Sequence, residues 1–171
     1  MQNIYLFSGP CGCGKSTLAE AFAKKADRQI YLLHGDAFHA GFIEPEDASL
    51  PRTSWEDILR FNWDCLLTVA RKALSMGLDV AIDYVVEDEL PLVKALADEY
   101  SAALHYIVLT ASEETLRQRL QTRGDAWLTE RALFLKHKLE HMPENQSHLL
   151  DITGMNLGEE ITQITHRSFR I

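Results

Sequence analysis

The sequence predicts an α/β protein in which one parallel sheet is covered by helices on both faces. Apolar runs typical of buried strands alternate along the 171-residue chain with segments whose apolar residues recur at helical spacing. A glycine-rich segment, residues 9–17, joins the first apolar run to the first helical pattern. The length suits a full hydrophobic core, so residues 1–171 are expected to form a single domain.

Apolar runs bounded by turn residues mark the expected strands. These strands cover residues 4–7, 29–34, 79–84, 103–110 and 148–152. The expected helices have apolar residues every three or four positions. They follow residue 17 and then cover about 54–76, 87–100, 113–125, 129–141 and a segment from 157 onward. Turn-forming and acidic residues indicate loops at 35–53 and 143–147.

Side chains that cap helix N-termini support these boundaries. Thr53 or Ser54 precedes the second helical pattern, and Ser112 precedes a helix whose first turn carries two glutamates. Asn156 is followed three residues later by Glu159, which is the spacing of a capping box. Each of these helices is therefore expected to begin directly after its capping residue.

Residues 9–17 read Gly-Pro-Cys-Gly-Cys-Gly-Lys-Ser-Thr and fit G-x-x-x-x-G-K-[ST], the phosphate-binding loop of nucleotide-binding enzymes. The glycines let backbone N–H groups approach phosphate oxygens, Lys15 supplies positive charge for the β- and γ-phosphates, and the Ser16 hydroxyl can bind Mg²⁺. A glycine-rich turn with an incidental lysine is the alternative, and the flanking strand and helix argue against it. The expected ATP-binding residues are Gly9, Gly12, Cys13, Gly14, Lys15, Ser16 and Thr17.

Two acids stand where expected strands give way to loops, which is where parallel sheets bind ligands. Asp36 follows the second strand and could accept the proton of a hydroxyl group that attacks the γ-phosphate. Asp83 ends the third strand and could hold Mg²⁺, directly or through water, or contact the acceptor. A turn or capping role is the alternative for both.

Arg119 and Arg123 lie four residues apart, on one face of an expected helix. Guanidinium groups suit the charge that spreads over a transferring phosphoryl group, so both arginines are expected to act in catalysis with Lys15 and Asp36. A solvated helix face paired with nearby glutamates is the alternative, and it suits Arg117 better than Arg123.

The formal net charge of −8 argues against a nucleic-acid substrate and against binding to a membrane surface. No apolar run reaches membrane-spanning length, and Met1 leads straight into the first expected strand without a targeting segment. We therefore expect a cytoplasmic protein, either a monomer or a homodimer, whose partner is a small-molecule acceptor.

Cysteine and histidine side chains do not form a convincing metal site. Cys11 and Cys13 are too sparse to bind zinc without partners, and small residues tolerated in a loop are the simpler interpretation. A thiol close to Lys15 could have a lowered pKa, which would make the loop sensitive to oxidation. His34 and His39 are expected to be satisfied histidines near a polar pocket.

These residues resemble the small P-loop kinases, a group that includes shikimate, gluconate, chloramphenicol and nucleoside monophosphate kinases. The resemblance covers essentially the whole chain and rests on the 9–17 loop, Asp36, Asp83 and the segment Arg119-x-x-x-Arg123-Gly-Asp. It implies a P-loop NTPase fold with strand order 2-3-1-4-5, an acceptor-binding segment at about 37–76 and a short lid at about 117–130. The lid is shorter than the insert of long adenylate kinases, and the acceptor-loop pattern of gluconate kinases is missing.

These observations predict a phosphotransferase that uses ATP and Mg²⁺ and moves the γ-phosphate to a hydroxyl group of a small molecule. Two alternatives stay open. One is a nucleoside or nucleotide kinase, and the other is a nucleotide-binding regulator without transferase activity. The preference between ATP and GTP and the identity of the acceptor stay open as well.

Overall fold

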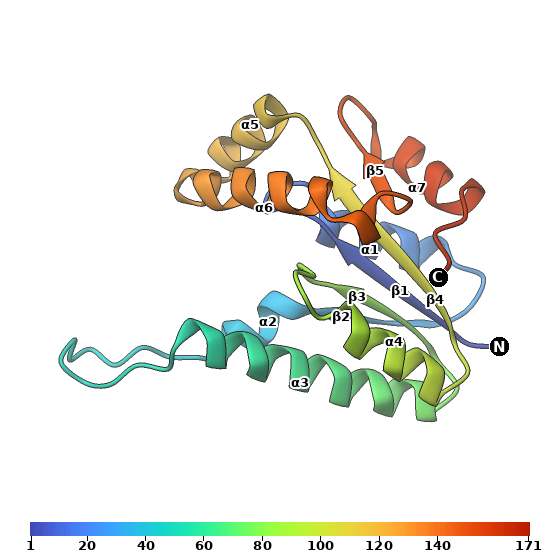
Figure 1. Ribbon diagram of the computed structural model, residues 1–171, viewed down its shortest axis with the longest axis horizontal. Coiled ribbons are helices and arrows are strands. Elements are labelled where there is room, and N and C mark those ends of the chain that lie inside the picture. Colours follow the sequence, from blue (N-terminus) through green and yellow to red (C-terminus); the bar gives the residue numbers. More distant parts are fainter.

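The computed structural model describes all 171 residues and contains one sheet of five parallel strands (Figure 1). The strand order, β2-β3-β1-β4-β5, confirms the order that the resemblance implied. Phe7 pairs with Asp83 and Ser8 with Val108, so the carboxyl ends of neighbouring strands meet at one edge of the sheet. The strands are β1 (Asn3–Ser8), β2 (Ile30–His34), β3 (Asp79–Asp83), β4 (Ala103–Thr110) and β5 (Leu149–Asp151).

Helices cover both faces of this sheet, as the sequence predicts. The longer ones are α1 (Lys15–Lys25), α3 (Trp55–Ser75), α4 (Leu90–Glu99), α5 (Glu113–Arg123), α6 (Thr129–His141) and α7 (Leu157–His166). Side chains of α3 and α4 form one hydrophobic core with the sheet, and those of α1, α5 and α7 form a second on the other face. Ile4 and Leu6 point into the first core and Phe7 into the second, because successive strand residues alternate between faces. No helix is both long enough and apolar enough to cross a bilayer.

The capping residues act as predicted. The Ser54 hydroxyl accepts a hydrogen bond from the Asp57 N–H at 3.1 Å, and α3 begins at the next residue. Asn156 and Glu159 form a complete capping box at the start of α7. Local sequence therefore determines where these helices begin.

Two segments differ from the prediction. The expected loop after β2 begins with a short helix, α2 (Gly35–His39), so Asp36 stands in a helical first turn. The helix expected from residue 87 begins only at Leu90. There the Glu89 carboxylate accepts hydrogen bonds from the N–H groups of Glu87 and Asp88, at 2.9 and 3.0 Å, and holds them in a turn.

The chain between α2 and α3 projects away from the sheet as an extended arm (Figure 1). The arm, residues 40–54, carries the exposed side chains of Ile43 and Leu50, and an ion pair of 2.7 Å joins Arg52 to Glu44. It lies within the segment where an acceptor-binding region is expected.

The end of the chain returns to the sheet, which the sequence analysis did not predict. β5 pairs only with the last three residues of β4. Further back along β4, the Tyr106 N–H donates to the Phe169 carbonyl at 2.9 Å, and the Ile171 N–H donates to the Leu104 carbonyl at 3.0 Å. This C-terminal segment therefore runs antiparallel beside β4 and covers the edge that β5 leaves open.

Candidate active site

Residues 9–14 form a tight loop between β1 and α1. Its glycines have positive φ angles, 142° at Gly9, 78° at Gly12 and 98° at Gly14, which strain any residue that has a Cβ. Gly9 also has no room for a side chain, because a Cβ there would lie 2.6 Å from the Leu109 carbonyl oxygen. Gly14 directly precedes α1, so the loop leads into the positive end of that helix dipole.

The Lys15 side chain bends back over this loop. Its Nζ donates hydrogen bonds to the carbonyl oxygens of Gly9 and Pro10, at 3.0 and 3.1 Å. Burial acts to lower the pKa of Lys15, but the neighbouring thiols and the carboxylates of Asp83 and Asp36 raise it above its ordinary value. The ammonium therefore stays protonated at neutral pH, held where the loop would receive an anion.

Asp36 lies close to this ammonium. It stands in the first turn of α2 and, with Lys15, Ser16 and Arg123, lines a cavity of about 150 Å³. The structure thus brings together one acid, two cations and one hydroxyl, of which Arg123 lies more than eighty residues from the other three in the sequence. All of them are at the carboxyl edge of the sheet, where the topology predicts a ligand site.

Asp83 lies deeper than Asp36. It ends β3 with 5% of its surface exposed, and its Oδ2 is 3.0 Å from His34 Nδ1 on the neighbouring strand. The carboxylate does not line the 150 Å³ cavity, although its negative charge helps to raise the pKa of Lys15. Its assignment to the metal or the acceptor stays a prediction, and the structure adds His34 as its direct partner.

The donors around the cavity fit a magnesium ion. The Ser16 hydroxyl and the Asp36 carboxylate are hard oxygen donors, which Mg²⁺ prefers. No group of three or more His, Cys, Asp or Glu side chains is close enough to hold a metal without other ligands. The arrangement therefore suits an ion that takes most of its ligands from phosphates and water.

The two predicted arginines have different surroundings. Arg119 Nη1 donates to the Cys13 carbonyl oxygen at 2.9 Å, which ties α5 to the phosphate loop. Arg123, the last residue of α5, is 61% exposed and forms an ion pair of 2.8 Å with Asp125. Arg117 forms only a long surface pair with Glu113, at 3.9 Å, as its alternative interpretation predicts.

A second, larger cavity of about 540 Å³ adjoins the outer side of the loop. Arg119 and Arg123 line it together with Thr17 and two residues that follow β5, Met155 and Leu157. Its size and its mixture of apolar and charged groups suit a nucleoside next to a phosphate tail. The sequence analysis missed Met155 and Leu157, because neither belongs to a recognisable motif.

The loop, both acids and both arginines lie within the stretch of sequence that matches one protein family. The AAA domain family AAA_33 matches residues 4–145. The chain belongs to this family. A search of the curated proteins gives no match.

Solved structures similar to this AAA domain chain share its fold at low sequence identity. An APS kinase from Mycobacterium tuberculosis, solved with AMPPNP and APS, has a TM-score of 0.69 and 18% identity, with 96% of this chain and 95% of that chain covered. A tunicamycin resistance protein from Deinococcus radiodurans has a TM-score of 0.67, 15% identity and coverage of 96% and 94%. A gluconokinase from Sinorhizobium meliloti has a TM-score of 0.61, 19% identity and coverage of 95% and 89%. The resemblance to small P-loop kinases is thus confirmed in the fold.

Tyr84 completes the wall of the 150 Å³ cavity in this AAA domain and was missed as a candidate site residue. Its ring packs so closely on the start of α2 that a Cβ at Gly35 would lie 2.2 Å from it. Its hydroxyl accepts a hydrogen bond from Asn62 Nδ2 on α3 at 2.9 Å. Tyr84 therefore connects the helix that carries Asp36 to the rest of the expected acceptor segment.

Glu87 is a second residue that the sequence analysis missed. Its carboxylate forms ion pairs with Arg131 and, at 3.1 Å, with Lys138, both on α6. This contact joins the loop after β3 to the helix that follows the expected lid. Only the fold brings these residues together, since forty or more positions separate them in the sequence.

The hypothesis of a reactive thiol is wrong for Cys13. This side chain is buried, and burial raises the pKa of its thiol above the ordinary value, although Lys15 acts in the opposite direction. The Cys13 thiol therefore packs as a small apolar group beneath the loop.

Proposed function

We propose that this protein is a phosphotransferase that uses ATP and Mg²⁺ and moves the γ-phosphate to a hydroxyl group of a small molecule. The observation that carries the proposal is the cavity shared by Lys15, Ser16, Asp36 and Arg123 at the end of a glycine-rich loop. Phosphoryl transfer depends mainly on positioning and on neutralising charge, and these side chains supply both.

The two adjoining cavities suit the two parts of a nucleotide. In this proposal the loop N–H groups hold the phosphates, and the Lys15 ammonium leaves its carbonyl partners to bind the β- and γ-phosphates. The nucleoside occupies the 540 Å³ cavity, with Arg119 on one side and Met155 and Leu157 on the other. The APS kinase, whose structure contains AMPPNP, supports a nucleotide on this fold.

Ser16 would hold the magnesium ion, and Asp83 would support it from behind, directly or through water. When bound, the ion would neutralise the phosphate oxygens that gain charge during transfer. Lys15 neutralises the same group from the loop, and Arg123 does so from the end of α5. The lid proposed at about 117–130 would bring Arg123 closer, since its exposed side chain is held only by Asp125.

The reaction needs one group that orients the attacking hydroxyl. Asp36 is the best candidate because its exposed carboxylate lines the cavity and its helix, α2, packs against α3. It would accept the hydroxyl proton while the oxygen attacks the γ-phosphorus. The acceptor would then lie between α2, the arm and α3, within the segment 37–76.

A nucleoside acceptor is the second candidate, and aromatic pairs in this segment favour it. His39 and Trp55 lie edge to face with their ring centroids 5.1 Å apart, and so do Phe42 and Phe61. Trp55 and Phe61 are about half exposed, so their rings remain open to stacking. Similar structures include an APS kinase and a gluconokinase, so the fold itself is compatible with different acceptors.

The experiment measures ADP release from ATP and Mg²⁺ in the presence of nucleosides, sugars and amino alcohols. One class is expected to stimulate release, and Asp36→Asn should reduce the stimulated rate by about 100-fold or more while ATP still binds. Asp64→Asn, an exposed acid on α3, is the matched control and should behave as wild type. Tight ATP binding with no acceptor response would instead indicate a regulator, and full activity of Asp36→Asn would reject the role of Asp36.

A further inference from the structure

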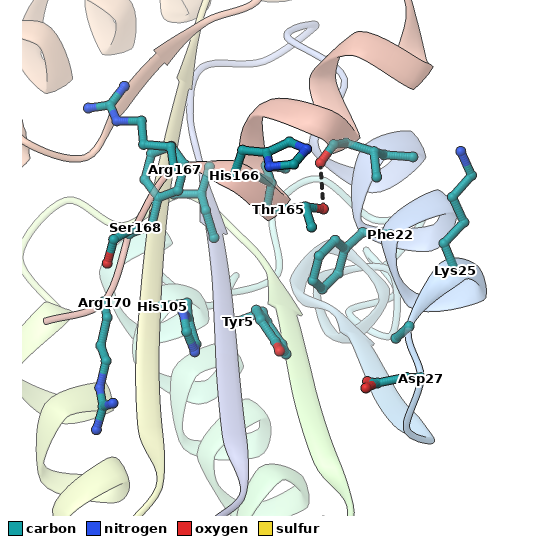
Figure 2. A pocket seen from close by; sticks show the side chains of 15 residues that line it. Tyr5, Phe22, Lys25, Asp27, His105, Thr165, His166, Arg167, Ser168 and Arg170 are labelled. Atoms are coloured by element: carbon teal, nitrogen blue, oxygen red, sulfur yellow. Dashed lines mark hydrogen bonds between the residues drawn. The ribbon is translucent and has the colours of Figure 1, made fainter.

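A further cavity lies away from the phosphate loop and is not used by the proposed reaction. It has a volume of about 570 Å³ and lies between α1, α7 and the C-terminal segment, over the first halves of β1 and β4 (Figure 2). Lys25 lines it at the last residue of α1, whereas Lys15 begins the same helix. The two ends of an 11-residue helix are about 16 Å apart, so the sites are separate.

Aromatic rings form the floor of this cavity. Tyr5 and His105 are partners on neighbouring strands, and their rings stack with centroids 4.8 Å apart. Phe22 of α1 meets Tyr5 edge to face at 4.7 Å. Ile164 and Phe169 add buried apolar surface from α7 and the C-terminal segment. A planar or apolar ring would therefore find contacts on several sides.

Polar groups without a strong partner surround this floor. Lys25 has no hydrogen bond or ion pair, and Arg170 has only a 4.0 Å contact with the Met1 sulfur. Arg167 does not contribute, because its guanidinium donates to the carbonyls of Ser147 and Leu149 at 2.8 and 2.7 Å. Figure 2 accordingly shows Lys25 and Arg170 at opposite ends of the cavity and Arg167 pointing away from it.

The charge of this cavity is opposite to that of the whole chain. The protein has a formal net charge of −8, yet apart from Arg167 the lining holds two basic side chains, Lys25 and Arg170, and one acid, Asp27. His105 adds a polar atom without adding charge. Asn3 donates its Nδ2 to Asp79, so its Oδ1 must accept from His105 Nε2 at 3.2 Å, which leaves Nδ1 free to accept.

We propose that this cavity is a second binding site, for a small aromatic anion. In it the ring of the ligand lies among Tyr5, His105 and Phe22, and its carboxylate or sulfonate faces Lys25 or Arg170. The inference stands independently of the phosphotransferase proposal, because it uses none of the residues of that site.

The test uses 8-anilinonaphthalene-1-sulfonate, an aromatic sulfonate whose fluorescence rises on binding, with the full-length protein at neutral pH. Saturable binding with one site per chain is expected. The double variant Lys25→Glu/Arg170→Glu reverses the charge at both ends of the cavity and should weaken the affinity for the dye about tenfold. Lys24→Glu is the matched control, because Lys24 is the exposed neighbour on α1 that pairs with Glu20 and does not line the cavity.

A steric variant and a competition experiment make the test decisive. Thr165→Trp at the exposed wall of α7 should block the cavity and abolish binding, while thermal denaturation checks that the variant is folded. Saturating ATP with Mg²⁺ should leave the dye bound. Displacement of the dye by ATP together with unchanged affinity in the Lys25/Arg170 double variant would overturn the proposal, as would the absence of saturable binding.

Discussion

His34 and Asp83 form a side-chain pair across neighbouring strands, with Nδ1 of the histidine 3.0 Å from Oδ2 of the aspartate. Both residues end their strands in register, β2 at His34 and β3 at Asp83. A carboxylate that is 5% exposed needs such a partner, because an unpaired buried acceptor loses its hydration without compensation. The pair therefore fixes the position of the Asp83 carboxylate at the carboxyl edge of the sheet.

Removing the histidine tests this relationship. His34→Ala should lower the free energy of unfolding by about 1–3 kcal/mol, because the Asp83 carboxylate loses its hydrogen bond. Urea denaturation measures the change. His137→Ala, at an exposed position on α6, is the control and should have little effect, and an equal loss in both variants would contradict the account.

Gly35 is required for the packing of Tyr84. A Cβ at this position would lie 2.2 Å from the tyrosine ring, so Gly35→Ala should destabilise the protein by about 1–3 kcal/mol. Gly41→Ala is the control, because its nearest atom would be 3.4 Å away. Gly35→Ala should cost less in a Tyr84→Ala background, because the two nearest atoms, at 2.2 and 2.3 Å, belong to the ring. An equal cost in both backgrounds, measured by urea denaturation, would show that the clash is not the cause.

These two pairs mark the limit of what sequence patterns predict here. Strand order, helix faces and caps follow from short-range patterns and from the resemblance, and the 9–17 loop needs only nine consecutive residues. The pairs His34–Asp83 and Gly35–Tyr84 join positions 49 residues apart, so their register appears only in the folded sheet. Helix α2 has no capping side chain or long apolar pattern, which explains why a loop was predicted there.

The C-terminal segment was missed for a different reason. Isolated backbone hydrogen bonds and the single buried ring of Phe169 hold it in place, and neither forms the alternating side-chain pattern of a strand. The second cavity depends on this segment, so no residue that lines it was recognised in the sequence.

Cys13 should be slow to react with alkylating reagents. Burial raises the pKa of its thiol, so the reactive thiolate forms only at alkaline pH and is shielded within the loop. Native protein treated with iodoacetamide at pH 7.5 should be labelled at the half-buried Cys11 and Cys65 before Cys13, as measured by peptide mass spectrometry. Labelling of Cys13 first would show that the loop is more open than described.

Replacing the buried Glu160 carboxyl on α7 should stabilise the protein in a pH-dependent way. Burial raises the pKa of this carboxyl above 4.5, although Arg119 lowers it in part, so folding favours the protonated form. The free-energy cost of ionising Glu160 in the folded protein is absent below the unfolded pKa and grows as the pH rises through the folded pKa. Glu160→Gln should therefore raise the melting temperature at pH 7, and the gain should vanish below about pH 4.5. A gain that persists in acid would contradict this explanation.

The central claim is that Lys15 and its loop bind the phosphates of ATP. Isothermal titration calorimetry of the wild-type protein and Lys15→Ala with ATP and Mg²⁺ tests it most directly, with Lys24→Ala as the control on the same helix. We expect saturable binding that Lys15→Ala weakens by about 100-fold and Lys24→Ala leaves unchanged. No heat of binding to the wild type, or equal affinity of wild type and Lys15→Ala, would contradict it.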